Sequence, residues 1–335
     1  MVSDSILKHL RELSHEIRDL DVGHEIPNVD VSELTPLSFY RDYVAKNKPV
    51  IIAGALESWP ALEHWTSEYL AQRMGPSQIT AAVTPDGRAD AVKRMPDGQE
   101  VFALPAYQSM PFAAFLQALR MPQKDEITYA QSQNNSMSEE FPALMDDISE
   151  LEWANEAFGG RPEATNFWIG GNESVTSFHK DHYENLYAVV SGVKVFFLLP
   201  PSDAYRMSMK RYPLAQYKRD ASCRLKLQLK EPPQEVPWSP VDLEACRQRM
   251  SADESAKDAL FWDDELPRPL AAHVGPGEVL YLPSLWYHYV RQRCYPFGEP
   301  VLAVNFWYDM PFDCKAAYAM MCEKMAGDSE VAPAS

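Results

Sequence analysis

Short apolar segments separated by turn residues dominate the chain after residue 126. Each segment is four to seven residues long and rich in aromatic and β-branched residues, which is typical of β-strands. Many short strands with few helical patterns between them predict an antiparallel barrel or jelly roll. The expected strands are residues 127–131, 166–169, 185–190, 193–199, 278–282, 286–290 and 302–307.

The beginning of the chain has a different pattern, in which helices and short strands alternate. A β-branched run at residues 50–52, closed by Gly54, predicts a strand, and residues 59–74 predict a helix that opens at Trp59-Pro60. An amphipathic helix rather than a targeting sequence is expected at the start. The apolar residues at helical spacing there are Ile6, Leu7, Leu10, Leu13 and Ile17.

These patterns divide the chain into three parts and give the fold class, mainly β with α-helical decorations. Residues 1–125 are expected to pack as a helix and strand region on the barrel, which residues 126–310 form. Residues 311–335 continue as a C-terminal helix and a tail. Within the barrel, residues 202–272 are polar and contain several prolines, so we expect an insertion that lies at the rim and shapes an entrance.

Composition and charge narrow the functions that such a barrel can have. The chain of 335 residues is 46% hydrophobic and 24% charged, as in ordinary soluble proteins. Its net charge of −17 disfavours nucleic acid and anionic membranes and favours a basic partner. No apolar run approaches the ~18 residues that span a bilayer. Five cysteines without a C-x-x-C pair indicate a reducing compartment, the cytoplasm with the nucleus as alternative.

Candidate metal chemistry begins with two histidines and an aspartate. His179 and Asp181 are two residues apart between strand patterns, so their side chains project to one face. His288 follows a tight turn far downstream, and an antiparallel barrel can bring it to the other two. Two imidazoles and one carboxylate leave the opposite face of a metal open, as in mononuclear non-haem iron oxygenases. A surface His–Asp pair is the alternative, because H-x-D arises often by chance.

Lys194 is the second chemical signal. It alternates with Phe196 and Leu198 on one face of an apolar strand, so a strand buried on both faces would bury the ammonium. A buried ammonium must find an anion or lose its proton. No carboxylate lies in that strand, and we therefore expect a bound anionic ligand. The alternative is a lysine whose head reaches solvent from an edge strand.

Together these residues resemble the JmjC-domain 2-oxoglutarate oxygenases, and more narrowly the small protein hydroxylases within that family. The resemblance extends from about Pro36 to Tyr318 and includes Lys-Pro-Val-Ile-Ile at 48–52 and Trp-Pro-Ala-Leu at 59–62. Its motifs are specific in combination. They are, in order, Tyr129, Thr176, His179-x-Asp181, Asn185, Lys194, His288 and Asn305-x-Trp307.

The resemblance implies a double-stranded β-helix of the cupin type that holds Fe(II) through His179, Asp181 and His288. It implies that 2-oxoglutarate chelates the iron and that its far carboxylate meets Lys194 and Thr176. The same resemblance assigns further contacts with the cosubstrate to Tyr129, Tyr187, Asn185, Asn305 and Trp307. A satisfied barrel asparagine and a core aromatic remain the alternatives for Asn305 and Trp307.

The activity implied is hydroxylation at C-3 of a lysyl residue, with O2 as oxidant and a basic protein segment as substrate. The family comparison points to a translation-associated GTPase of the developmentally regulated GTP-binding type. The alternatives are a JmjC histone lysine demethylase, a histone-tail peptidase and a cupin barrel that only binds a partner. Demethylases more often have glutamate where Asp181 stands, and no nucleophile motif favours a peptidase. A homodimer through the last helix stays open.

Overall fold

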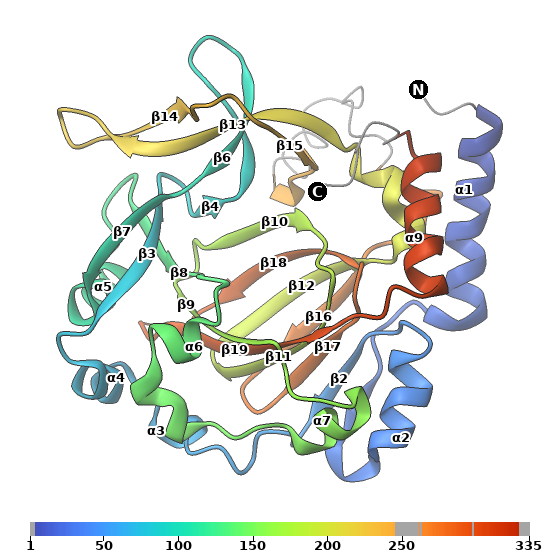
Figure 1. Ribbon diagram of the computed structural model, residues 1–335, viewed down its shortest axis with the longest axis horizontal. Coiled ribbons are helices and arrows are strands. Elements are labelled where there is room, and N and C mark those ends of the chain that lie inside the picture. The colour runs from blue at the N-terminus through green and yellow to red at the C-terminus, as the bar shows by residue number, and fades with distance from the viewer. Residues whose placement is uncertain (1–3, 245–260, 262, 297, 328–335) are drawn as a thin grey trace.

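The computed structural model describes residues 4–244, 261, 263–296 and 298–327, and its strands form a double-stranded β-helix (Figure 1). The large sheet has nine strands in the order β1-β2-β17-β11-β19-β9-β8-β3-β7. Their bounds are β1 Asn28–Asp30, β2 Val50–Ala53, β17 Val279–Leu282, β11 Tyr183–Ser191, β19 Val301–Asp309, β9 Ala164–Gly170, β8 Ile127–Ala130, β3 Gln78–Thr84 and β7 Ala106–Pro111.

A five-stranded sheet in the order β16-β12-β18-β10-β4 faces the large one. Its bounds are β16 Leu270–Val274, β12 Val193–Leu199, β18 Tyr287–Arg293, β10 Val175–His179 and β4 Arg88–Ala89. Between the sheets, Val189 and Leu280 of the large sheet belong to one buried cluster with Phe196 and Leu198 of β12. The predicted β-rich cupin fold is confirmed.

Strands from the first 125 residues extend the large sheet at both ends. β2 pairs with β17, and β8 is followed by β3 and β7. Helices cover the outer face of this sheet, which is why β11 and β19 are buried along nearly their whole length and are mostly apolar. The covering helices are α2 Pro36–Phe39, α3 Ala61–His64, α4 Ser67–Met74, α5 Phe112–Arg120, α6 Ser136–Glu139 and α7 Glu152–Phe158.

The predicted terminal helices are present as α1 (Asp4–Ile17) and α9 (Cys314–Met325), which run side by side in Figure 1. Both contact the 3-10 segment η5 (Pro201–Met207). The helix predicted over residues 59–74 is instead divided into α3 and α4. Thr66 is extended between them, and its hydroxyl accepts the backbone N–H of Tyr69, so it begins a new helix.

A third sheet lies on the rim, in the order β14-β13-β6-β5 with β15 paired to β13. Its bounds are β14 Leu225–Leu229, β13 Lys210–Arg219, β6 Glu100–Leu104, β5 Ala91–Arg94 and β15 Glu235–Trp238. The predicted insertion at 202–272 therefore supplies strands to a sheet that earlier residues complete. Its residues 245–260 and 262 lie outside the described part, as does the predicted tail from 328 onward.

Among the described residues, no helix combines the length and the apolar character needed to cross a bilayer.

Candidate active site

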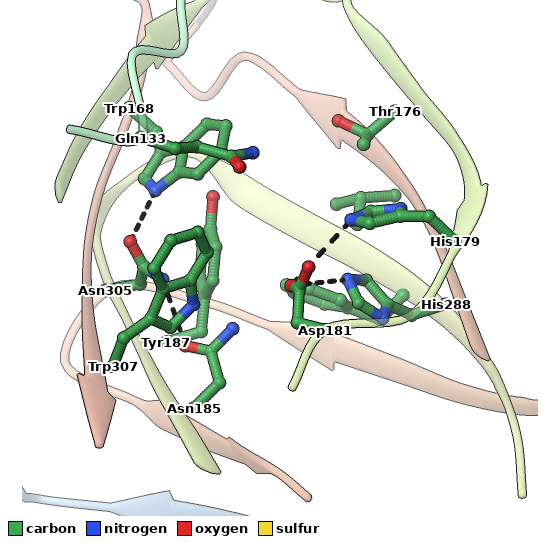
Figure 2. Close-up of a pocket in the computed structure, with 12 residues that line it drawn as sticks. Gln133, Trp168, Thr176, His179, Asp181, Asn185, Tyr187, His288, Asn305 and Trp307 are labelled. Carbon is green, nitrogen blue, oxygen red and sulfur yellow. Dashed lines mark hydrogen bonds and ion pairs between the residues drawn. The ribbon is translucent and has the colours of Figure 1, made fainter. Parts of the chain in front are cut away.

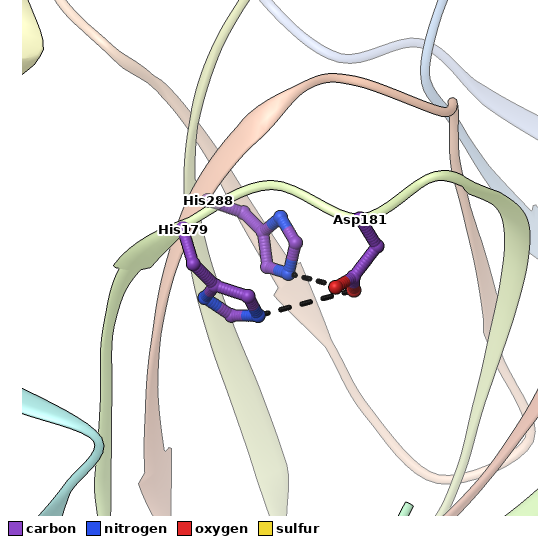
Figure 3. Close-up of side chains that lie close together, drawn as sticks. All are labelled: His179, Asp181 and His288. Atoms are coloured by element: carbon purple, nitrogen blue, oxygen red, sulfur yellow. Dashed lines mark ion pairs between the residues drawn. The ribbon is translucent and has the colours of Figure 1, made fainter. Parts of the chain in front are cut away.

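His179, Asp181 and His288 meet at one end of the barrel because β10 and β18 are antiparallel neighbours. His179 is the last residue of β10 and lies opposite His288 in the register, so the ring centroids are 4.1 Å apart. Asp181 follows in the next loop. Its Oδ2 lies 3.8 Å from Nε2 of His179 and 3.7 Å from Nε2 of His288 (Figure 3). One ligand atom from each residue therefore lies within 4.8 Å of the others.

Backbone carbonyls fix how the two imidazoles are protonated. Nδ1 of His179 lies 2.9 Å from the carbonyl of Ser177, and Nδ1 of His288 lies 3.0 Å from that of Trp286. A carbonyl only accepts, so each Nδ1 carries a proton, and Nε2 is the nitrogen that faces Asp181 and can ligate a metal. Burial, with repulsion from His179, lowers the pKa of His288 to about 4, so this ring is neutral at neutral pH. Two imidazoles and one carboxylate fit Fe(II).

A bulge in β10 lets two residues at odd spacing face the same pocket. Thr176 pairs with Val290 and His179 pairs with His288, so three steps along β10 match two steps along β18. In a regular strand, residues three apart point to opposite faces. Here both Thr176 and His179 line the pocket.

The triad opens into a pocket of about 360 Å³, counting its open mouth (Figure 2). Eight of the ten predicted site residues line it, and four lining residues were not predicted: Gln133, Trp168, Phe196 and Val290. The eight are Thr176, His179, Asp181, Asn185, Tyr187, His288, Asn305 and Trp307. Lys194 and Tyr129 lie beyond this lining, next to Tyr187.

Lys194 is an interior residue, because β12 runs between β16 and β18 rather than at an edge. It is 1% exposed, and its ammonium donates to the hydroxyl of Tyr129 at 2.9 Å and to Oε1 of Gln292 at 2.5 Å. The ammonium also lies 5.7 Å from the ring centroid of Tyr187. No carboxylate pairs with it among the described residues, and burial lowers its pKa to about 7. This group lacks the anion that would offset its desolvation.

Gln292 is a site residue that the sequence analysis missed. It lies directly across from Lys194 in the register of β12 and β18. The signal was present, since His288, Val290 and Gln292 alternate along one face of a strand. Gly170 leaves room for this group, because a Cβ there would lie 2.6 Å from the ring of Tyr129 and 2.7 Å from Nε2 of Gln292.

On the opposite wall, a chain of side-chain hydrogen bonds holds the amides. Trp168 Nε1 donates to Oδ1 of Asn305 at 2.8 Å, and Nδ2 of Asn305 donates to Oδ1 of Asn185 at 3.1 Å (Figure 2). Trp307 stacks on Tyr183 with ring centroids 4.8 Å apart. Its buried indole N–H has no hydrogen-bond partner among the described residues. Asn305 is thus satisfied by protein groups, whereas Trp307 keeps a donor for a ligand.

Comparison with known proteins identifies the family. Residues 36–314 match the family model of the cupin-like domain. The chain is also 38% identical to the human "bifunctional peptidase and (3S)-lysyl hydroxylase JMJD7", over 96% of each chain. The chain belongs to the JmjC family. Members of this family are oxygenases that use Fe(II) and 2-oxoglutarate, and the His179–Asp181–His288 group is consistent with the metal.

Two further JmjC relatives cover most of this chain. "Lysine-specific demethylase JMJ32" of Arabidopsis thaliana is 43% identical over 93% of this chain and 89% of its own length. "JmjC domain-containing protein E" of Dictyostelium discoideum is 35% identical over 92% and 90%, respectively. Relatives that match nearly the whole chain are therefore named for two different reactions on lysine.

Proposed function

We propose that this chain is an Fe(II)- and 2-oxoglutarate-dependent hydroxylase that acts on a lysyl residue of a protein. The observation that supports it most is the combination of an open two-histidine, one-carboxylate site with a buried ammonium that lacks an anion. Val290 and Gln292 follow His288 along one face of β18, and Gln292 is paired with Lys194, so one interval of the pocket separates the metal ligands from the ammonium. A short diacid bridging that interval would engage both ends.

Each residue has a role in this proposal. His179, Asp181 and His288 would hold the metal, which supplies oxidation of an unactivated C–H bond while 2-oxoglutarate is split to succinate and carbon dioxide. Lys194 would neutralise the far carboxylate, with the hydroxyl groups of Thr176 and Tyr129 nearby as further donors. The other predicted residues line the opposite wall of the pocket. Asn185 and Asn305 would orient the end of 2-oxoglutarate that lies at the metal, Trp307 would donate its free N–H to the ligand, and Tyr187 would exclude water.

Lysine as the target has two supports. The names of the plant and human relatives both refer to lysine, and the net charge of −17 favours a basic segment. A GTP-binding protein of the developmentally regulated type is our candidate source of that segment. We also infer a cytoplasmic location, consistent with the unpaired state of the four described cysteines, Cys223, Cys294, Cys314 and Cys322.

The test is product analysis with the full chain. With Fe(II), O2 and 2-oxoglutarate, a basic lysine-containing peptide is expected to gain one oxygen atom on its lysine, in step with succinate formation. Fragment mass spectrometry locates the oxygen, and a reaction without 2-oxoglutarate is the control. Oxygen found only on another type of residue would refute the lysyl assignment.

Lysine demethylation is the second candidate, because the plant relative named for it is 43% identical to this chain. The two reactions differ in product. A demethylase would release formaldehyde from a methylated lysine peptide and leave an unmethylated lysine unchanged. Offering both peptides to the same preparation separates the candidates, and peptide cleavage without consumption of 2-oxoglutarate would instead indicate the peptidase activity in the human relative's name.

The affinity for 2-oxoglutarate is expected to fall as pH rises above 7. Burial lowers the pKa of Lys194 to about 7 in the free protein, whereas a carboxylate bound beside it favours the ammonium. Below pH 7 the group is already charged, and above pH 7 binding must first take up a proton. The Kd should therefore rise by up to about tenfold per pH unit.

Anaerobic titration of the iron-loaded protein on both sides of pH 7 measures this effect. Iron content is determined at each pH, because the histidine ligands also bind protons. Lys194→Met should show a much flatter profile. An equally steep profile in that variant would assign the proton to another group.

A further inference from the structure

Asp90 is a carboxylate beside the metal ligands that the proposed mechanism does not use. β4 runs parallel to β10 with Ala89 opposite Thr176, so the next residue, Asp90, lies abreast of Ser177. The hydroxyl of Ser177 donates to the Asp90 carbonyl at 2.6 Å and accepts from Trp238 Nε1 at 3.0 Å. The hydroxyl of Ser177 thus ties the backbone of Asp90 to β10 and, through Trp238, to the rim sheet.

The same hydrogen bonds connect Asp90 to the metal end of the pocket. The indole of Trp238 lies parallel to the ring of His179, with an interplanar angle of 8° and centroids 6.1 Å apart. On the other side, Gln131 Nε2 donates to Oδ2 of Asp90 at 3.1 Å. Gln133, two residues further along the same segment, lines the pocket. Asp90 therefore lies at the flank of the pocket rather than in its lining.

The carboxylate of Asp90 lacks a cation. It is half-buried, and among the described residues Gln131 is its one hydrogen-bond donor and no lysine or arginine pairs with it. Nearby acids differ: Asp86 pairs with Lys93 at 2.5 Å, and Asp242 pairs with Arg88. Burial raises the pKa of Asp90, with His179 opposing that shift. A partly desolvated carboxylate with spare acceptor capacity gains most from a cation that arrives with the substrate.

We propose that Asp90 binds the ammonium group of the substrate lysine while C-3 of that lysine is held toward the metal ligands. This inference rests on the proposed function. The ammonium of lysine lies four bonds from C-3, roughly 5 Å at ordinary bond lengths. A carboxylate at the flank of the pocket suits that spacing, whereas oxidation of an N-methyl group would place the nitrogen itself beside the metal. The indole of Trp238, which lies parallel to the ring of His179, can cover the methylene stem.

Peptide binding tests the proposal without oxygen or turnover. Two basic peptides are used, one with a single central lysine and its twin with norleucine, which keeps C-3 and removes the ammonium. Fluorescence anisotropy gives both Kd values for the iron-loaded full chain with 2-oxoglutarate under argon. Because a hydrogen bond to a charged group contributes about 1.5 to 3 kcal/mol, Asp90→Asn is expected to reduce the preference for lysine about 10- to 100-fold.

Asp86→Asn is the matched control, since it removes the same charge four residues away from a carboxylate that already has Lys93 as its partner. It should keep the preference for lysine. Asp90 has a φ of 52°, which asparagine and glycine both adopt readily, so Asp90→Asn and Asp90→Gly should fold and retain iron. An unchanged preference in both Asp90 variants, an equal loss in Asp86→Asn, or a loss of iron in the Asp90 variants would overturn the assignment.

The binding assay also separates the failure of this inference from failure of the proposed function. If the lysine preference depends on Asp90 but no oxygenated product forms in air, the proposed hydroxylase activity is refuted and Asp90 remains a lysine-binding residue. If oxygenated lysine forms but the preference for the lysine peptide does not depend on Asp90, only the assignment of Asp90 is refuted.

Discussion

Asp181→Ala is expected to lose both iron and turnover. The carboxylate is the only anionic member of the group, and without it two neutral imidazoles would have to hold a divalent ion alone. Changes to residues behind metal ligands already cost 10- to 100-fold in affinity or activity, so loss of a ligand should cost at least about 100-fold. Metal analysis after gel filtration measures the iron, and succinate formation measures the turnover.

The fold should survive this substitution. The backbone carbonyl of Asp181 accepts the N–H of Leu285 at 2.9 Å, and that bond does not involve the side chain. Asp264→Ala is the control, because Asp264 is an exposed acid paired with Arg268. If the Asp181 variant kept its iron and its rate of succinate formation, Asp181 would not be a ligand.

Lys194→Met is expected to raise the Kd for 2-oxoglutarate with little change in iron content. Methionine fills a similar volume without the charge. Truncation of one partner of a buried charged pair costs about 3 kcal/mol, which corresponds to about 150-fold in Kd. The free protein should become more stable at neutral pH, because the buried ammonium has no anion to offset its desolvation.

Comparing two ligands in two proteins isolates the interaction between Lys194 and the far carboxylate. 2-Oxopentanoate lacks the far carboxylate, so it should bind the wild type much more weakly than 2-oxoglutarate does. Lys194→Met should remove most of that difference, since the variant has no ammonium to bind the far carboxylate. Lys226→Met, which changes an exposed lysine paired with Asp220, serves as control. Retained discrimination in Lys194→Met would assign the far carboxylate to another cation.

The barrel could be predicted because its strands are buried on both faces. β11, β12 and β19 are long apolar runs, a local property that composition reveals directly. The strands β13 and β14 were missed because they lie on the rim, where half of their residues meet water and the sequence is mostly polar. The pairing of β13 with β6 depends on contacts more than a hundred residues apart, which no local pattern contains.

The site residues also differ in how far the sequence alone could predict them. The burial of Lys194 could be predicted from its apolar neighbours along one strand. Its actual partners come from β8 and β18, so only the register of the assembled sheets brings Tyr129 and Gln292 to the ammonium. Asp90 likewise acquires its position from the pairing of β4 with β10. β4 has only two residues and therefore no recognisable pattern of its own.

The bulge between Thr176 and His179 makes the number of residues in β10 as important as their identity. If the same residues formed a regular strand, the three steps between Thr176 and His179 would turn them to opposite faces, and either the hydroxyl or the imidazole would leave the pocket. A variant with a straightened strand would retain every side chain of the site and still lose the site. Among homologues, loss of one residue between the two would instead give the spacing at which a regular strand holds both on one face.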